Sequence, residues 1–417
     1  MRIVRPVALI VLLFAVSIVP SYRAGQSLPA QLSDAAYWQL VENSSEPDGA
    51  FFSENFLSNE RGFQYVIPAL LERVPSGGVY MGVGPEQNFT YISALRPKLA
   101  FIIDIRRQNM MEHLLYKALF EIAPGRVEFL SRLFSRKLAA NPPPDSDIKD
   151  LFDAFAMVEE NESLYAANLR DVRDVLLKKH GFGLSDEDLA SLEHVYHEFS
   201  RQGTLIGYSV SDTLLMAQIN TRARNGRSAN APQPPPQAPA FADPAELLRI
   251  LSLQAEPTLA QVLTAAPVTQ PSFPNYAELM SATDGAGHDW SYLATEDHYK
   301  TVRDMQLQNR IVPLVGDFAG PKAIRSVGEY LKGHDAKLTT FYISNVEQYL
   351  NPAEMKRFYA NVTSVPLDPS SSFIRSAQGT GAQPGIVQSY ISPVQEVIDA
   401  VMEGRVQSFY DILRIWH

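Results

Sequence analysis

Two glycines and an acidic residue have the spacing of a nucleotide-binding loop. Gly82 and Gly84 lie in the run GVGPEQN (82–88), and Asp104 follows 22 positions after Gly82. Glycine lets the backbone approach a ligand closely, and an acid about 20 residues further along accepts hydrogen bonds from a ribose hydroxyl. This spacing fits NAD, FAD and S-adenosylmethionine (SAM) equally well.

Two neighbours of the glycines favour SAM over a dinucleotide. Gln87 stands where a dinucleotide fingerprint has its third glycine or alanine, so the fingerprint is incomplete. Glu86 lies in the first predicted helical turn, where it would repel a pyrophosphate but attract the sulfonium and ammonium groups of SAM. We therefore predict that Gly82, Gly84, Glu86, Gln87 and Asn88 hold SAM. The alternative is that the acid only complements the helix dipole and the glycines only turn the chain.

The hydrophobic pattern predicts the elements that position this loop. Apolar runs at 78–84 and 99–105 predict buried strands, and 85–95 and 108–122 predict the helices that follow them. Alternation at this spacing predicts a parallel sheet with helices on both faces. The pattern returns with strands at 311–315 and 338–344 and helices at 321–331 and 352–359. The expected fold class is α/β, a doubly wound, mostly parallel, Rossmann-like sheet.

The α/β domain is predicted in two parts, 31–135 and 310–417. Residues 126–134 are a candidate third strand, and the chain is expected to end with a strand near 362–367 and a helix over 393–413.

A mostly helical insertion is expected at 136–309, with polar helices at 164–179 and 185–201. Inside it, 225–244 is rich in proline, which favours extended conformations, so we expect a flexible, disordered linker there.

The first 25 residues have the pattern of a signal peptide. Arg2 and Arg5 precede an apolar run over 7–19 that ends at Pro20. The run is shorter than the roughly 20 residues that cross a bilayer. The alternative is an uncleaved N-terminal anchor. We expect an exported (periplasmic or extracellular) or membrane-tethered protein whose only contact with the membrane is this segment.

The net charge and the residue composition exclude several classes of binding partner and site. A net charge of -10 argues against nucleic acid, because phosphate neutralisation needs a basic face. The chain contains no cysteine, which excludes disulfides and thiolate sites. His194 and His197 are three apart, but no third ligand accompanies them, so no metal site is predicted. A small-molecule ligand is the expected partner.

Several runs resemble an uncharacterised bacterial family related to class I SAM-dependent methyltransferases. They are LSNERGFQYV (57–66), GVGPEQNFTYISALRPKLAFIIDIRRQN (82–109), VPLVGDFAGPKAI (312–324), FYISNVEQYL (341–350) and SSFIRS (371–376). The resemblance covers nearly the whole chain from about residue 31. It implies a sheet of the class I methyltransferase type and SAM as the cofactor.

The resemblance also implies roles for the cofactor-binding residues. Gly82 and Gly84 would lie against the amino-acid moiety of SAM, and Asp104 would hold its ribose. Asp317 and Phe318 would frame the adenine. We favour an assignment in which Asp317 follows the third strand of the sheet. If residues 126–134 form a strand, Asp317 follows the fourth strand instead. The alternative role for Asp317 is to cap the helix predicted at 321–331.

By the same resemblance, the residues expected beside the methyl group and the substrate follow the strand at 338–344. They are Ser344, Asn345 and Glu347, with Glu347 as the candidate general base and Asn345 as the second candidate catalytic residue. Arg106, Arg107 and Arg375 are candidates for a rim that binds a carboxylate or phosphate substrate, although solvated surface arginines are an equal alternative.

Three functions follow from these patterns. The first is a SAM-dependent methyltransferase that works mainly by proximity and orientation. The second is an exported ligand-binding or scaffold protein that keeps the fold without turnover, which export favours because SAM is made in the cytoplasm. The third, a nicotinamide-dependent oxidoreductase, is disfavoured by Gln87 and Glu86.

Overall fold

A six-stranded sheet forms the centre of the protein. The computed structural model describes residues 27–51, 53–140, 142–207, 273–378 and 387–416. The strands are β1 (Val79–Gly82), β2 (Leu99–Asp104), β3 (Ile311–Val315), β4 (Leu338–Ser344), β5 (Leu367–Gln378) and β6 (Val387–Pro393). Their order is β3-β2-β1-β4-β5-β6, with β1 to β5 parallel and β6 antiparallel to β5. The expected α/β class with a mostly parallel sheet is confirmed, and this order is compatible with a Rossmann-like fold.

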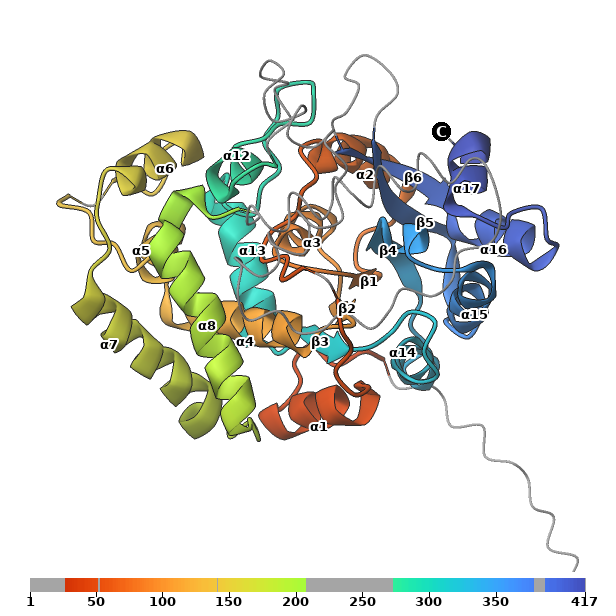
Figure 1. Ribbon diagram of the computed structural model, residues 1–417, viewed down its shortest axis with the longest axis horizontal. Helices are drawn as coiled ribbons and strands as arrows, with labels where there is room; N and C mark the ends of the chain where they lie inside the picture. The colour runs from red at the N-terminus through yellow and green to blue at the C-terminus, as the bar shows by residue number, and fades with distance from the viewer. Residues whose placement is uncertain (1–26, 52, 141, 208–272, 379–386, 417) are drawn as a thin grey trace, which may run out of the picture.

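Helices cover both faces of the sheet (Figure 1). On one face lie α14 (Ala323–Gly333), α15 (Pro352–Val362) and α16 (Val394–Met402), with α1 (Asp34–Ser44) beside α14. On the other face lie α2 (Ile67–Arg73), α3 (Gln87–Leu95), α4 (Arg107–Ile122) and α13 (Glu296–Leu307). The other α-helices of the described residues are α5 (Arg126–Leu133), α6 (Ile148–Ala156), α7 (Glu162–Arg173), α8 (Asp186–Gln202), α12 (Tyr276–Met280) and α17 (Phe409–Trp416). Helices α5, α7 and α8 pack against α4 and lie outside this helical layer, and α6 contacts α12 (Figure 1).

The strands form because their residues suit burial on both faces. All six residues of β2 are buried, and so are all of β1 and β3, as expected for parallel strands sandwiched between helices. These continuous apolar runs made the central strands predictable. Strand β6 is different, because five of its seven residues are only partly buried.

The structure corrects the prediction of a strand at 126–134. These residues form helix α5, whose buried apolar side chains Phe129, Leu130 and Leu133 recur at helical spacing. The third strand is therefore β3, so Asp317 follows the third strand and Asn345 the fourth, as we favoured.

The C-terminal elements also differ from expectation. Helix α15 continues to Val362, and the strand expected near 362–367 begins only at Leu367. The helix expected over 393–413 is two helices, α16 and α17, preceded by strand β6. The turn at Gly404, with φ of +77°, separates the two helices.

Parts of the predicted organisation fall outside the described residues. These are the N-terminal segment 1–25 and the proline-rich stretch 225–244. In the described part of 136–309 the expected helices are present, with Ser185 capping α8 and the end of 164–179 wound as a π-helix over Asp174–Lys179. Within the described ranges, none of the helices combines the length and apolar character needed to span a bilayer.

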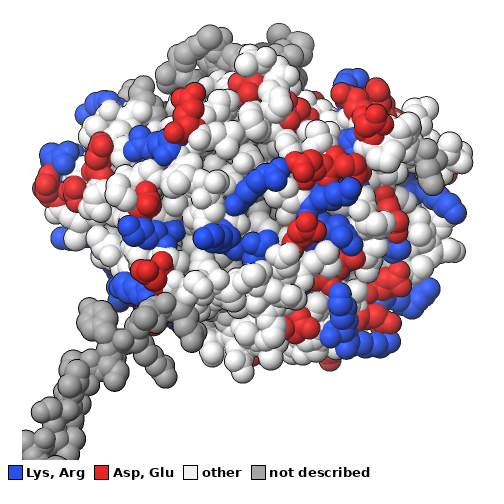
Figure 2. Space-filling model, turned by 180° about the vertical axis from the view of Figure 1, so that it is seen from behind, with Lys and Arg blue, Asp and Glu red and all other residues white. Residues whose placement is uncertain are grey.

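Charges of both signs alternate over the face shown in Figure 2. Lysine and arginine side chains there lie close to aspartate and glutamate side chains rather than forming one broad basic area. This face therefore offers no extended positive surface of the kind that neutralises a phosphate backbone.

Candidate functional site

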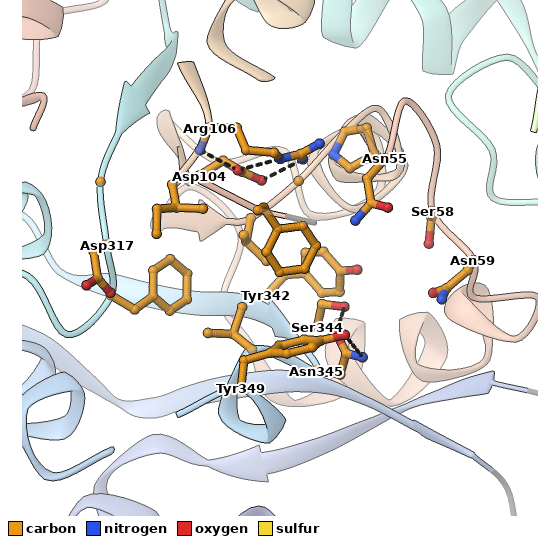
Figure 3. Close-up of a pocket in the computed structure, with 18 of the residues that line it drawn as sticks. Asn55, Ser58, Asn59, Asp104, Arg106, Asp317, Tyr342, Ser344, Asn345 and Tyr349 are labelled. Carbon is orange, nitrogen blue, oxygen red and sulfur yellow. Dashed lines mark hydrogen bonds and ion pairs between the residues drawn. The ribbon is translucent and has the colours of Figure 1, made fainter. Parts of the chain in front are cut away.

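A cavity of about 320 Å³ opens at the carboxyl ends of β1 to β4. In an open α/β sheet the ligand crevice lies where the strand order reverses, here between β1 and β4. The residues that line it come from the loop after α1, from the strand ends and from the start of α15 (Figure 3). They are Ala50, Phe51, Asn55, Leu57, Ser58, Asn59, Glu60, Val83, Gly84, Pro85, Gln87, Asp104, Ile105, Arg106, Gly316, Asp317, Phe318, Tyr342, Ser344, Asn345, Val346, Tyr349, Leu350 and Glu354.

The glycine loop after β1 presents only part of itself to the cavity. Gly84 lines it with φ of +77°, and a side chain added there would meet only Gln87 Nε2, at 3.7 Å. Gln87 also lines the cavity, and its Nε2 donates to Tyr342 Oη at 2.8 Å. Gly82 faces away and packs against Asn88 and Tyr80 so closely that no side chain fits.

Asn88 organises the loop from within. Its Nδ2 donates to the carbonyl oxygens of Val83 at 2.9 Å, Gly84 at 3.2 Å and Pro85 at 2.7 Å, and its Oδ1 accepts from Tyr80 at 2.8 Å. Of the predicted cofactor-binding residues in this loop, Gly84 and Gln87 line the cavity, whereas Gly82, Glu86 and Asn88 do not. Asn88 and Gly82 pack inside the loop and shape it.

Glu86 is fully buried at the beginning of α3, outside the cavity lining. Burial raises the pKa of its carboxyl to about 8, because a charged carboxylate is poorly solvated in the interior. At neutral pH the group is therefore mostly uncharged, which does not fit the predicted role as counter-charge for SAM.

Asp104, at the end of β2, lines the cavity but is tightly paired. Arg106 reaches back to it, with Nε 3.0 Å from Oδ1 and Nη2 3.0 Å from Oδ2, and the Arg106 backbone N–H also donates to Oδ1 at 2.9 Å. Arg106 Nη1 donates to the carbonyl oxygens of Ser53 and Glu54, so the same guanidinium ties down the loop over the cavity. A carboxylate has about four lone-pair positions, so Oδ2 still has room for one more donor.

Asp317 and Phe318 lie at the end of β3 and line the cavity. Asp317 is exposed, and its Oδ1 accepts from Ala319 N at 2.9 Å. It does not cap α14, because Glu46 Oε1 accepts the backbone N–H groups of Lys322 at 2.7 Å and Ala323 at 3.0 Å. The capping alternative for Asp317 is therefore wrong.

Ser344 and Asn345 lie at the end of β4 and line the cavity. Ser344 has φ of +49°, a left-handed conformation that is unfavourable for residues other than glycine. Its hydroxyl donates to Glu60 Oε1 at 2.6 Å. Asn345 Nδ2 lies 3.4 Å from Tyr349 Oη (Figure 3). The ring of Tyr349 stands edge-on to that of Phe51.

Glu347 and Arg375 do not reach the cavity. They form an ion pair with no exposed side-chain surface, with Arg375 Nε 2.7 Å from Glu347 Oε2 and Nη2 3.2 Å from Oε1. Tyr359 donates to the same carboxylate, and Arg375 also donates to Ser392. The pair joins the turn after β4 to β5 and β6. Because both side chains are buried in this pair, the catalytic role predicted for Glu347 and the substrate-binding role predicted for Arg375 do not fit their positions.

Glu60 is a cavity residue that the predicted site did not include. Its Oε1 accepts from Tyr342 Oη and Ser344 Oγ, each at 2.6 Å, and its Oε2 accepts from Ser389 Oγ at 3.2 Å. The side chain is buried, and this burial raises the pKa of its carboxyl. Glu60 lies in the LSNERGFQYV run, but nothing local in that run indicates that it folds onto β4.

No metal centre is found within the described ranges, where three or more His, Cys, Asp or Glu side chains never gather in a suitable arrangement. His194 Nε2 lies 2.8 Å from Glu54, and His197 Nδ1 lies 3.6 Å from Glu198. These contacts are pairwise and on the surface.

Comparison with known proteins places the chain by family. No curated protein matches the chain. A family model matches residues 55–141 and 246–407, which together make up more than half of the sequence. The first stretch contains Glu60, Gly84, Asp104 and Arg106, and the second contains Asp317 and Ser344. The chain belongs to the family described as a domain of unknown function (DUF7790).

Proposed function

We propose that the protein binds S-adenosylmethionine in the cavity at the ends of β1 to β4 and transfers its methyl group to a small acceptor. The observation that carries this proposal is the position of Asp104, which ends β2 and faces a cavity at the point where the strand order reverses. That position suits a carboxylate that accepts a hydrogen bond from a ribose hydroxyl. The cavity volume of about 320 Å³ lies within the usual range for small-molecule sites.

The charge of the lining supports a cationic ligand. Glu60, Asp104, Asp317 and Glu354 line the cavity, and Arg106 is the basic residue among the lining side chains. Since Arg106 is already paired with Asp104, a pyrophosphate would meet carboxylates without a spare positive partner. The sulfonium and ammonium groups of SAM would instead be attracted by these carboxylates. This contrast disfavours NAD and FAD.

The ligand would lie along the strand ends. Its ribose would reach the remaining lone pair of Asp104 Oδ2, and its adenine would lie toward Phe318 and Asp317. Phe318 stacks on Phe358, with ring centroids 5.2 Å apart and the ring planes inclined by 27°. Gly84 would allow the amino-acid end to approach the backbone, because no side chain stands there.

A second candidate is a protein that binds such a ligand without turnover. The burial of Glu347 in its pair with Arg375 favours it, because the residue expected to act as base after β4 has no access to the cavity. In that case ligand affinity remains and methyl transfer is absent.

The test is calorimetric titration of the full chain with SAM, S-adenosylhomocysteine and NAD. We expect both adenosyl compounds to bind and NAD not to bind. Asp104→Asn should weaken binding of S-adenosylhomocysteine at least tenfold, whereas Asp153→Asn, an exposed acid on α6 outside the cavity, should leave it unchanged. Silence toward both adenosyl compounds, or tighter binding of NAD, would reject the proposal.

A further inference from the structure

The cavity has two chemically different ends. At the β2 and β3 end lie Asp104, Arg106, Asp317 and Phe318. The end beside β4, which we call the acceptor end, is lined by Ser58, Asn59, Glu60, Ser344, Asn345 and Tyr349. Figure 3 shows Ser58 and Asn59 on the covering loop, on the side of the cavity away from Asp317. Among these six residues Glu60 is the acid, and the other five side chains are neutral and polar.

The arginines predicted to bind an anionic substrate are all engaged elsewhere. Arg106 is paired with Asp104, Arg107 contacts Asp188 with Nη2 2.8 Å from Oδ2, and Arg375 is buried against Glu347. A carboxylate or phosphate acceptor would therefore face Glu60 without a basic partner in the acceptor end. The anionic substrate expected from the sequence does not fit this arrangement.

Within the part of the chain that the structure describes, the side chains that donate hydrogen bonds to Glu60 are neutral. Tyr342, Ser344 and Ser389 donate to it, and Gln87 fixes Tyr342 from the other side at 2.8 Å. A buried carboxylate held by hydroxyls alone keeps a substantial desolvation cost, and a cation brought by the ligand would offset it. The position of Glu60 therefore suits a ligand that brings a positively charged group to its carboxylate.

The backbone at Ser344 supports a functional reading of this position. Its left-handed φ of +49° aims the hydroxyl at Glu60, 2.6 Å away. Residues other than glycine keep such a conformation only where their surroundings enforce it, and these conformations cluster at ligand sites.

We propose that the acceptor is an amine, that its ammonium group binds at Glu60 in the acceptor end, and that Glu60 takes its proton before methyl transfer. This inference rests on the proposed methyltransferase function. The ammonium gives one proton to the Glu60 carboxylate and becomes a neutral amine. The nitrogen lone pair then attacks the methyl carbon of SAM, a C–N bond forms, and the C–S bond breaks with its electron pair passing to sulfur. The products are an N-methylammonium and S-adenosylhomocysteine, and the proton on Glu60 passes to solvent when they leave.

Three matched probes test the proposal, namely benzylamine, benzyl alcohol and benzoate, which share a ring and differ in charge. They are titrated into the full chain saturated with S-adenosylhomocysteine. We expect benzylamine to bind at least tenfold more tightly than benzyl alcohol, and benzoate to bind most weakly. Glu60→Gln should remove the preference for the amine. The control Glu278→Gln, an acid paired with Arg61 outside the cavity, should keep it.

The outcomes separate this inference from the proposed function. Binding of S-adenosylhomocysteine with no preference for the amine, or with equal preference in folded Glu60→Gln, overturns the inference alone. Failure of S-adenosylhomocysteine to bind overturns the proposed function, and the probes are then titrated without it. If Glu60→Gln does not fold, Glu60→Asp keeps the charge and withdraws it by one methylene. An unchanged amine preference in that variant also counts against Glu60.

Discussion

The guanidinium of Arg106 holds both oxygens of the Asp104 carboxylate, with one 3.0 Å contact to each. Two residues apart in the sequence, they form a nearly buried pair at the end of β2. Through its contacts with Ser53 and Glu54, Arg106 also anchors the loop that covers the cavity. The orientation of the carboxylate and the closure of the cavity therefore depend on the same side chain.

Arg106→Met should weaken binding of S-adenosylhomocysteine at least tenfold, because Asp104 loses its orientation and the covering loop loses its anchor. Arg107→Met is the matched control, since Arg107 pairs with Asp188 and does not line the cavity. Calorimetric titration of both variants measures the effect. Equal affinities in the two variants would contradict the role given to Arg106.

Glu347→Gln should destabilise the fold by about 3–5 kcal/mol, because it leaves Arg375 charged and buried without its counter-ion. The double variant Glu347→Leu with Arg375→Met removes both charges and should be more stable than the single variant. Urea denaturation measures the free energies of unfolding. A single variant as stable as the wild-type protein would contradict the buried pair.

The two glycines of the loop should respond differently to alanine. At Gly84 the added methyl group has room, so Gly84→Ala costs only the left-handed conformation, about 1–2 kcal/mol. At Gly82 the methyl group would collide with Asn88 and Tyr80, so Gly82→Ala should displace the side chain that organises the loop and cost more. Thermal unfolding of both variants gives the order, and a milder effect at Gly82 would contradict it.

Glu121 should contribute to stability that is lost in acid. It lies among Lys117, Lys179 and His180, and its ion pairs outweigh its burial and lower the pKa of its carboxyl to about 2. Because the folded-state pKa is below the unfolded value, the contribution is complete above about pH 4.5 and disappears as the pH falls toward 2. We expect a contribution of about 3 kcal/mol from this shift of the pKa. The difference in unfolding free energy between the wild-type protein and Glu121→Gln, measured from pH 7 to 2, should shrink across this window.

Glu86 should act in the opposite direction. Its folded-state pKa of about 8 exceeds the unfolded value of 4.5, so the folded protein keeps a proton that the unfolded chain releases. Stability from this group is therefore full below about pH 4.5 and lost as the pH rises to 8. Glu86→Gln should gain stability relative to the wild-type protein between these values. A difference between the two that does not change with pH would show that Glu86 is ionised in the fold.

The sequence alone determined the elements whose signal is local. The continuous apolar runs of β1, β2, β3 and β4 identify buried parallel strands, because such strands are covered on both faces. Parallel strands place their carboxyl ends at one edge of the sheet. The sequence therefore predicted which strand-end residues would meet, and Gly84, Asp104, Asp317 and Ser344 do line one cavity.

The tertiary structure decided which side chains face that cavity and which are paired with other side chains of the protein. Glu347 and Arg375 are 28 positions apart, and Glu60 and Ser344 are 284 apart. Helix α5 was mistaken for a strand because a short apolar run fits either period. Whether a charged side chain is available to a ligand depends on partners brought near by folding. The spacing of residues along the chain does not indicate those partners. Only the folded protein therefore shows that Glu60 lines the cavity and that Glu347 does not.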